Sequence, residues 1–191
     1  DSYRTPVVHH GFIEPHEALA SPDASGKITL WCSTKAAFAI RSATCNALGL
    51  PMSRLRVIAP MVGGDYGGKG TAQAEPICVL LALKAGQPVR LTLTREEELA
   101  ATYMRQASVC HLKVGATRNG RLLALQGELI YDTGAYCDLM GISPARLGFF
   151  LGPYSIANVQ FTGFRVYTNN SPRGHMRGPG GPQVCFAVES H

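Results

Sequence analysis

The residues whose types and spacing best suit chemistry lie in a glycine-rich segment, PMVGGDYGGKGTA, at residues 60–72. Gly63, four further residues, Gly68 and Lys69 match most of a phosphate-binding loop, in which backbone N–H groups and a lysine hold phosphates. Gly70 stands where that motif has the Ser or Thr that binds Mg²⁺. Backbone without side chains also suits a tight turn or another closely bound cofactor. A phosphate site, another cofactor site and a structural turn therefore all stay open at this point.

A second glycine-rich segment, SPRGHMRGPGGP at residues 171–182, also lies just before an expected helix. Arg173 and Arg177 stand there beside glycine backbone. Guanidinium groups and the N–H groups at a helix start together suit a phosphate or an oxo group. The alternative is a surface loop whose arginines pair with carboxylates. Two such loops in one chain, each preceding a helix, favour the anion-binding interpretation.

Short alternating runs of apolar and polar residues predict the strands that must position these loops. Three of these strands are expected at residues 27–33, 54–59 and 88–94. The helices predicted between them cover residues 36–48 and 76–85. The second helix is apolar on nearly every side, so we expect it to be deeply packed.

The clearest local pattern is a hairpin over residues 109–136, in which Asn119 and Gly120 join two alternating runs and predict a type I′ turn. A further strand is expected over residues 160–168, and a last helix begins near Pro182. The predicted fold class is α+β, with mixed β-sheets and packed helices.

The composition is typical of one globular domain over residues 1–191. Hydrophobic residues make up 46% and charged residues 16%, which excludes a disordered chain. The net charge of +5 comes from scattered Lys and Arg without a basic run, so no nucleic-acid partner is expected. No apolar run reaches the roughly 18 residues of a membrane span. The chain begins at Asp1 without Met, and we expect it to be a fragment of a longer protein.

The six cysteines lie too far apart for a metal site, because no two are within four residues of each other. Most stand in apolar runs, which predicts free buried thiols and a reducing, cytoplasmic location. His9, His10 and His16 follow no metal-binding spacing and are expected to be structural or exposed. No metal ligand is therefore predicted. The cysteines are Cys32, Cys45, Cys78, Cys110, Cys137 and Cys185.

Six segments follow one another in the order and spacing of one known family, and together they span essentially the entire chain. They are EPHEALA (14–20), LWCSTKAA (30–37), RVIAPMVGGDYGGKG (56–70), GQPVRLTLTREEEL (86–99), DTGAY (132–136) and RGPGGPQ (177–183). In this pattern the chain resembles the first molybdopterin-binding domain of the molybdenum hydroxylases. That family includes xanthine dehydrogenase, aldehyde oxidase, carbon monoxide dehydrogenase and nicotinate dehydrogenase.

The resemblance implies which residues contact the cofactor, molybdopterin. The family's Gly-Gly-Gly-Phe-Gly-Gly-Lys loop lies with its backbone against the molybdenum centre, and Arg177 matches an arginine beside the cofactor. Lys35 replaces a family glutamine that approaches the molybdenum; its side chain either stabilises negative charge there or extends into solvent. Tyr66 takes the place of the phenylalanine. The loop residues implied to bind the cofactor are Gly63, Gly64, Asp65, Tyr66, Gly67 and Gly68.

The resemblance also implies three substrate-binding positions. Gly70 replaces a glutamate that contacts purine in xanthine-type members, and Pro179 replaces a phenylalanine that stacks on an aromatic substrate. Arg146 aligns with their second substrate-binding arginine. We therefore do not expect purine recognition of the xanthine dehydrogenase kind. N-heterocycles, aldehydes and carbon monoxide all stay open as substrates.

The activity that the resemblance implies is hydroxylation of a small substrate, with water as the oxygen source. The family's general base is a glutamate in a later domain, so no catalytic residue is expected in this fragment, which should be inactive alone. The implied partners are a second molybdopterin-binding domain and modules that carry 2Fe-2S clusters and FAD. Whether the pterin has the cytosine dinucleotide form stays open. The rival hypothesis is a non-enzymatic nucleotide- or anion-binding domain built on the two glycine-rich loops.

Overall fold

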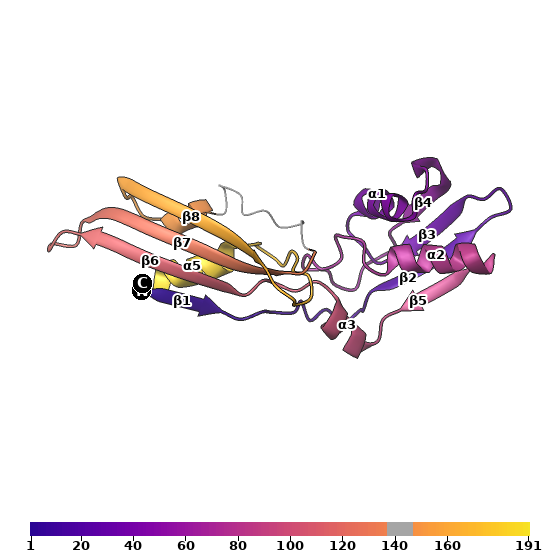
Figure 1. Ribbon diagram of the computed structural model, residues 1–191, viewed down its shortest axis with the longest axis horizontal. Helices are drawn as coiled ribbons and strands as arrows, with labels where there is room; N and C mark the ends of the chain where they lie inside the picture. Colours follow the sequence, from indigo (N-terminus) through magenta and orange to yellow (C-terminus); the bar gives the residue numbers. More distant parts are fainter. Residues whose placement is uncertain (137–146) are drawn as a thin grey trace. The chain divides into compact units, whose positions relative to one another are not determined.

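The computed structural model describes residues 1–136 and 147–191, and the chain divides into two compact units. Asp1–His9 and Tyr103–His191 make one, the split unit. His10–Thr102 make the other, the inserted unit. Each has its own four-stranded sheet (Figure 1). Each also has its own hydrophobic core. That residues 1–191 form a single domain stays a prediction, and this region contains two separate hydrophobic cores.

The sheet of the inserted unit has the strand order β4-β3-β2-β5. β2 (Glu17–Pro22) pairs antiparallel with β3 (Ile28–Cys32) and β5 (Val89–Thr92). β4 (Leu55–Ile58) pairs parallel with β3, which requires a crossover connection. That crossover is α1 (Ala37–Leu48). The three strands predicted in this region are confirmed, and β2 adds a fourth.

α1 and α2 (Glu75–Ala85) pack against each other and on one face of this sheet (Figure 1). The alternate residues of β2 and β3 that point to this face are fully buried, as the period of two along a strand requires. The helices end at Gly49 and Gly86, both in the left-handed conformation typical of helix ends. The core consists of Ala18, Ala20, Ile28, Leu30, Cys32, Ile40, Cys45, Leu55, Cys78, Val79 and Ala82.

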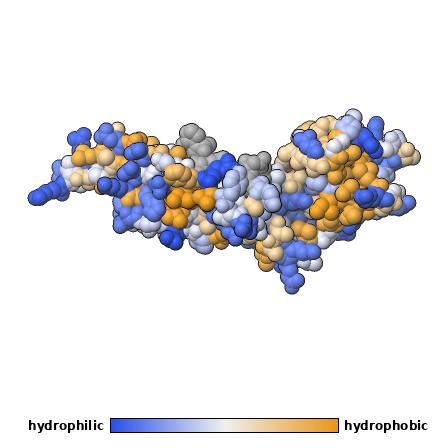
Figure 2. Space-filling view, in the orientation of Figure 1, coloured by the Kyte–Doolittle hydropathy of each residue, from blue (hydrophilic) through white to orange (hydrophobic). Residues whose placement is uncertain are grey.

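The expectation that α2 is deeply packed holds for one side of the helix only. Its Cys78, Val79 and Ala82 are fully buried against the sheet and α1. Ile77 and Leu81 lie on the opposite side and are about half exposed, and Figure 2 shows apolar surface around α2. The reason is that the unit has two layers, so a helix on the sheet has only one face to bury.

α3 (Arg95–Ala101) is a short helix with a capping box at its start. The Glu97 N–H donates to the Thr94 hydroxyl at 3.2 Å, and the Thr94 N–H donates to the Glu97 carboxylate at 2.8 Å. This reciprocal pair satisfies N–H groups that a helix start leaves open. It also fixes the turn that carries Glu98 into the interior, where that side chain is fully buried.

The sheet of the split unit has the order β1-β6-β7-β8. β1 (Ser2–Thr5) and β7 (Leu122–Gly134) both pair antiparallel with β6 (Ser108–Ala116), whereas β8 (Asn158–Tyr167) pairs parallel with β7. In this unit α5 (Gly181–Ser190) packs against a short 3₁₀ helix, η2 (Gly148–Leu151). The inserted unit has a similar 3₁₀ turn, η1 (Met52–Arg54), just before β4. The core residues of the split unit are Cys110, Leu112, Leu125, Leu129, Tyr131, Phe150, Val184 and Ala187.

The predicted hairpin is confirmed, but its type I′ turn is wrong. A type I′ turn needs positive φ at both central residues. Gly120 has a φ of +86°, whereas Asn119 is not among the non-glycine residues with positive φ. The Gly120 N–H donates to Thr117 O at 3.0 Å and the Thr117 N–H to Arg121 O at 2.9 Å. The connection is therefore a longer loop in which Gly120 adopts the left-handed conformation and Asn119 keeps a negative φ.

Both sheets mix parallel and antiparallel pairs and are covered by helices, so the predicted α+β class is confirmed. Among the described ranges of the chain, no helix is both long and apolar enough to cross a membrane.

Candidate functional site

The glycine loop, residues 63–70, lies against the segment His10–His16 of the same unit. The Gly63 N–H donates to Glu14 Oε2 at 2.7 Å, and the Glu14 N–H donates back to Gly63 O at 3.3 Å. A Cβ added at Gly64 would lie 2.8 Å from Phe12 Cβ, and one added at Gly68 would lie 2.8 Å from Phe12 Cε1. These glycines are therefore needed because the loop approaches its own supporting segment so closely.

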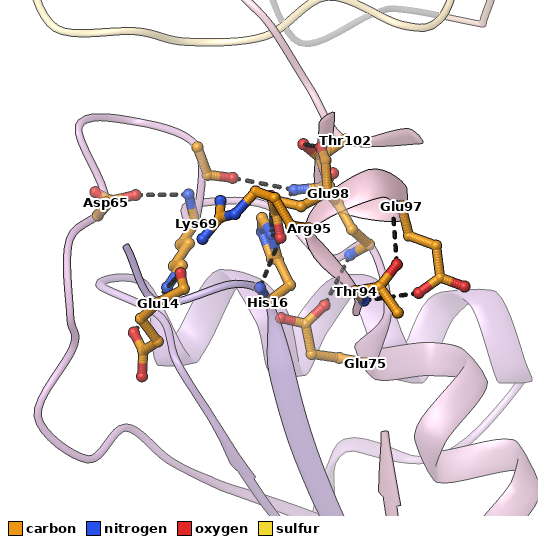
Figure 3. A network of polar contacts seen from close by, with 12 residues as sticks. Glu14, His16, Asp65, Lys69, Glu75, Thr94, Arg95, Glu97, Glu98 and Thr102 are labelled. Atoms are coloured by element: carbon orange, nitrogen blue, oxygen red, sulfur yellow. Dashed lines mark hydrogen bonds and ion pairs between the residues drawn. The ribbon is translucent and has the colours of Figure 1, made fainter. Parts of the chain in front are cut away.

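Lys69 points inward, and its side chain is fully buried. Its Nζ donates to Glu14 Oε2 and to Glu14 O, each at 2.7 Å (Figure 3). The same nitrogen lies 4.6 Å from the centre of the Phe12 ring. The Thr34 hydroxyl donates to Lys69 O at 2.7 Å. Burial opposes ionisation of Glu14, but hydrogen bonds from Lys69 and Gly63 outweigh it and lower the pKa of Glu14. The lysine thus anchors the loop from inside.

The Asp65 carboxylate closes the loop upon itself. Its Oδ1 accepts from the Lys69 N–H at 2.5 Å, and its charge also receives a backbone hydrogen bond from Gly67. Oδ2 pairs with Lys35 Nζ at 2.9 Å. Burial opposes ionisation of Asp65, but the hydrogen bonds from Lys35 and from Lys69 N–H outweigh it and lower its pKa.

These contacts do not fit a phosphate-binding loop. In such a loop, backbone N–H groups and the lysine point at the phosphates. Here a carboxylate of the loop itself takes the N–H groups of Gly67 and Lys69, and the lysine ammonium binds Glu14 on the inner side. The rival hypothesis of a nucleotide-binding domain loses its main support.

A buried chain of hydrogen bonds connects the glycine loop to α3. Gln73 Nε2 donates to Gly68 O at 3.0 Å and lies 2.8 Å from His16 Nε2. A carbonyl oxygen can only accept, so the group that faces it is the NH₂ of Gln73, and His16 Nε2 must accept the second hydrogen. His16 therefore carries its proton on Nδ1, which donates to Glu98 Oε1 at 2.9 Å.

Glu98 ends this chain as a fully buried carboxylate (Figure 3). Its Oε2 also accepts from the His16 backbone N–H at 2.7 Å. Burial alone would raise the pKa of Glu98, but the hydrogen bonds from the His16 ring and backbone lower it to about 2. The carboxylate is therefore ionised at neutral pH and fixes the tautomer of His16.

The outer side of the glycine loop has a different character. Tyr66, whose φ is +48°, is 44% exposed. A left-handed conformation is unusual for a bulky residue, and it turns the backbone sharply between two glycine pairs. Met61, just before the loop, is 96% exposed. The loop and the residue before it thus present an aromatic ring, a thioether and bare backbone to solvent.

The second glycine-rich loop, in the split unit, is also held from inside. Arg105 Nη2 donates to Arg177 O at 2.5 Å, and the Tyr131 hydroxyl donates to Gly180 O at 3.3 Å. Arg105 Nη1 donates to Gln183 Oε1 at 3.1 Å. Two carbonyl groups of the loop are thus satisfied by the protein, which favours N–H groups and the exposed Arg177 on the outer side.

Arg173 differs from Arg177 in its surroundings. Its side chain is buried, and Nη2 lies 3.4 Å from Asp132 Oδ2. That carboxylate also accepts from the Thr168 hydroxyl at 2.6 Å and from the Asn170 amide at 3.1 Å. The alternative interpretation, an arginine that pairs with a carboxylate, is therefore correct for Arg173. Asp132 therefore serves a structural cluster.

The structure brings most of the implied cofactor residues together in the inserted unit. Gly63 to Gly68 form one continuous loop, and Lys35 pairs with it through Asp65. The Lys35 side chain is 53% exposed and lies beside Gly70, where an added Cβ would be 3.1 Å from Lys35 Cε. Pro179 and Arg177 lie in the other loop, in the split unit. Arg146 lies outside the described residues.

The residues that support the loops were not found from the sequence. Glu14 and His16 occur in the EPHEALA segment, which only suggested a family, and the spacing of Gln73 and Glu98 gave no signal at all. The expectation that His16 is structural is confirmed, since its ring is buried and hydrogen-bonded. No group of three or more His, Cys, Asp or Glu that could hold a metal occurs among the residues described.

Comparisons with known proteins agree with this picture. A family model described as a molybdopterin cofactor-binding domain matches residues 1–191. The chain is 36% identical to the xanthine dehydrogenase molybdenum-binding subunit of Escherichia coli, over 98% of this chain and 25% of that protein. It is also 36% identical to the nicotinate dehydrogenase large molybdopterin subunit of Eubacterium barkeri, over 99% of this chain and 45% of that protein.

A solved structure, reconstituted CO dehydrogenase from Oligotropha carboxidovorans, matches with a TM-score of 0.91 and 27% identity, covering 100% of this chain and 24% of that one. The aldehyde oxidoreductase from Desulfovibrio gigas matches with a TM-score of 0.88 and 25% identity, over 98% of this chain and 21% of that one. The chain thus spans less than half the length of each of these relatives.

Proposed function

The chain belongs to the molybdopterin cofactor-binding domain family, and from this premise we propose that it is part of a molybdenum hydroxylase and forms one wall of the cofactor site. The observation that carries the proposal is that one family model spans residues 1–191 and therefore includes both glycine-rich loops. The relatives named as xanthine, nicotinate and CO dehydrogenases support it.

The residues present fit an anionic, oxo-rich cofactor. In the inserted unit the glycine loop is anchored from inside by Lys69 and Gln73, so its outer backbone is held in place without a ligand. In the split unit, Arg177 is exposed and its loop leads into the start of α5, which carries no acidic residue in its first turn. N–H groups at a helix start and a guanidinium group are suitable donors for phosphate and oxo groups.

When bound, the molybdenum cofactor supplies the oxidation chemistry by which a small substrate is hydroxylated with oxygen from water. The part of this chain is to bind and orient that group. We propose that residues 63–68 and Arg177 contact the cofactor. Lys35 forms an ion pair with Asp65 and thereby places an ammonium donor beside the glycine loop. No catalytic acid or base is assigned to residues 1–191.

The proposed substrate is a small N-heterocycle, aldehyde or carbon monoxide. Gly70 and Pro179 lack the side chains with which xanthine-type members are expected to contact purine. The proposed partners are a second molybdopterin-binding domain and modules with 2Fe-2S clusters and FAD. The pterin is proposed with or without a cytosine dinucleotide. A cytoplasmic location is also proposed, supported by the free thiols among the described cysteines.

The experiment is metal and pterin analysis of the full-length protein purified from its natural host. We expect about one molybdenum and one pterin per chain. An Arg177→Ala variant should bind the cofactor roughly 10- to 100-fold more weakly and so retain less molybdenum, because a charge-assisted contact contributes roughly 1.5–3 kcal/mol. Arg118→Ala is the matched control, since Arg118 is an exposed arginine in the hairpin loop of the same unit. Absence of molybdenum from the unmodified protein would overturn the proposal.

A further inference from the structure

Gln73 connects the glycine loop to a group that can change its charge. Its Nε2 donates one hydrogen to Gly68 O at 3.0 Å and the other to His16 Nε2 at 2.8 Å. The second bond exists only while His16 Nε2 carries no proton. Because one nitrogen makes both bonds, the orientation of the amide toward His16 and its orientation toward the loop cannot change separately.

A second proton on His16 would turn Nε2 from a hydrogen-bond acceptor into a donor. The ring would then donate there, and the Gln73 amide would have to turn its oxygen toward the ring. In the present geometry this places the amide oxygen where Nε2 now stands, 3.0 Å from Gly68 O. Two acceptors at that distance repel each other, and a buried carbonyl without a donor is unfavourable. The loop would lose its bond and move away.

The charged groups around His16 come from every element that packs near it. Glu98 of α3 accepts from Nδ1, and Arg95 of the same helix donates to Ile13 O at 2.5 Å. Glu75 of α2 accepts from the Gln73 N–H at 2.7 Å. Lys69 lies beyond the Phe12 ring, whose centre is 5.7 Å from that of His16. Of these four groups, Glu98 bonds the ring directly, whereas the other three bond or contact neighbouring residues.

We propose that Gln73 is a positioning residue for the glycine loop, and that its hydrogen bond to Gly68 requires the neutral form of His16. A second proton on His16 then releases the inner side of the loop. The consequence for cofactor retention rests on the proposed function, because it requires that the outer side of this loop contacts the cofactor. The coupling between His16 and the loop does not.

The test is amide hydrogen exchange of the full-length protein, followed by mass spectrometry from about pH 8 to about pH 5, where histidine titrates. Rates are corrected for the intrinsic pH dependence of exchange. In the unmodified protein, protection of the peptide covering residues 63–70 should fall about tenfold toward the acidic end, as the loss of one buried hydrogen bond implies. Peptides from β7 should stay protected and thus report that the protein remains folded.

Two variants of Gln73 distinguish coupling from simple packing. Gln73→Leu removes both donors at similar volume and should give a poorly protected loop at every pH. Gln73→Glu offers a carboxylate to His16, favours its protonated form, and should already behave at neutral pH as the unmodified protein does in acid. Ser108→Ala is the control, because it removes a hydrogen bond of a buried side chain, 2.8 Å to Thr5 Oγ1, in the split unit.

A loop whose corrected protection is independent of pH in the unmodified protein would overturn the proposal, even if neither variant folds. So would normal protection in folded Gln73→Leu. Molybdenum content measured on the same samples separates the two proposals. If the unmodified protein holds no molybdenum but its loop responds to pH as described, the coupling stands and the proposed function fails.

Discussion

Asp65 offers a sharp test of how the glycine loop keeps its shape, because its two carboxylate oxygens make different contacts. Oδ2 forms the ion pair with Lys35, whereas Oδ1 accepts from the Lys69 N–H. The carboxylate also receives the backbone hydrogen bond from Gly67. Asp65→Ala removes all three contacts. Lys35→Gln removes only the ion pair, so the two variants separate the charge pair from the closing of the loop.

The exposure of the partners sets the expected magnitudes. Lys35 is 53% exposed, and ion pairs in water contribute about 0.2–1 kcal/mol, so Lys35→Gln should lower the stability of the loop by less than about 1 kcal/mol. Asp65 is only 16% exposed, and two backbone N–H groups would lose a charged acceptor. Asp65→Ala should therefore cost about 2–3 kcal/mol. Asp65→Asn keeps an oxygen acceptor and should cost about 1 kcal/mol.

The assay is native-state hydrogen exchange of the full-length protein, which gives the free energy of local opening for the peptide over residues 63–70. In an Asp65→Asn background, Lys35→Gln should have almost no further effect, because the ion pair is already lost. Asp23→Ala is the matched control: this carboxylate also accepts from two backbone N–H groups, those of Ser25 and Lys27, but in the turn between β2 and β3. It should leave the glycine loop unchanged.

Equal effects of Lys35→Gln and Asp65→Ala would refute this reasoning, because they would mean that the ion pair alone shapes the loop. A large residual effect of Lys35→Gln in the Asp65→Asn background would refute it too. Lys35 would then act through another contact, such as a bound cofactor, and the molybdenum content of the Lys35→Gln protein should change in parallel.

Three further predictions concern the groups that support this loop. The pKa of Glu98 is about 2 against a usual 4.5, so the ionised carboxylate contributes on the order of 3 kcal/mol to stability. This contribution is fully present above about pH 4.5 and is lost as the pH falls toward 2. Glu98→Gln should remove this acid dependence, which is measured by unfolding followed by circular dichroism. Lys69→Met should lower the local stability of the loop by about 2–4 kcal/mol in hydrogen exchange, because Glu14 loses its buried partner, and an unchanged loop would contradict the inward placement of the ammonium. Gly68→Ala should cost about 1–3 kcal/mol in thermal unfolding, because the new Cβ would lie 2.8 Å from Phe12, whereas Gly148→Ala, which meets no atom within 4 Å, should be nearly neutral.

The elements of the fold followed from the sequence wherever a local pattern decided them. Alternation along β3 predicts a strand with one buried face, and Ile28, Leu30 and Cys32 are indeed fully buried. Gly86 ends α2 as its position after the last apolar residue predicts. Local patterns could not show how many layers would cover α2, so its apolar outer side was misjudged. They also could not show that the chain leaves the split unit after His9 and returns at Tyr103, since that depends on long-range pairing.

For the candidate site, the sequence located the two glycine-rich loops but not the groups that hold them. Glycines are visible because they are rare in regular elements, whereas a supporting carboxylate or amide looks like any other surface residue. Glu98 is an example: in the run REEEL nothing distinguishes it from its neighbours, yet it alone is buried. Which of three adjacent glutamates turns inward is decided by the partner, His16, more than eighty positions earlier.

The near match to a phosphate-binding loop has a physical explanation. Both kinds of loop need glycines because a partner approaches the backbone closely, and both have a lysine directly after a glycine. They differ in which side holds the partner. Here the close partner on the inner side is the protein's own segment with Phe12 and Glu14, and Lys69 is used to neutralise it. A loop anchored in this way from inside keeps its outer backbone ordered before any ligand binds, which reduces the conformational entropy that binding would otherwise cost.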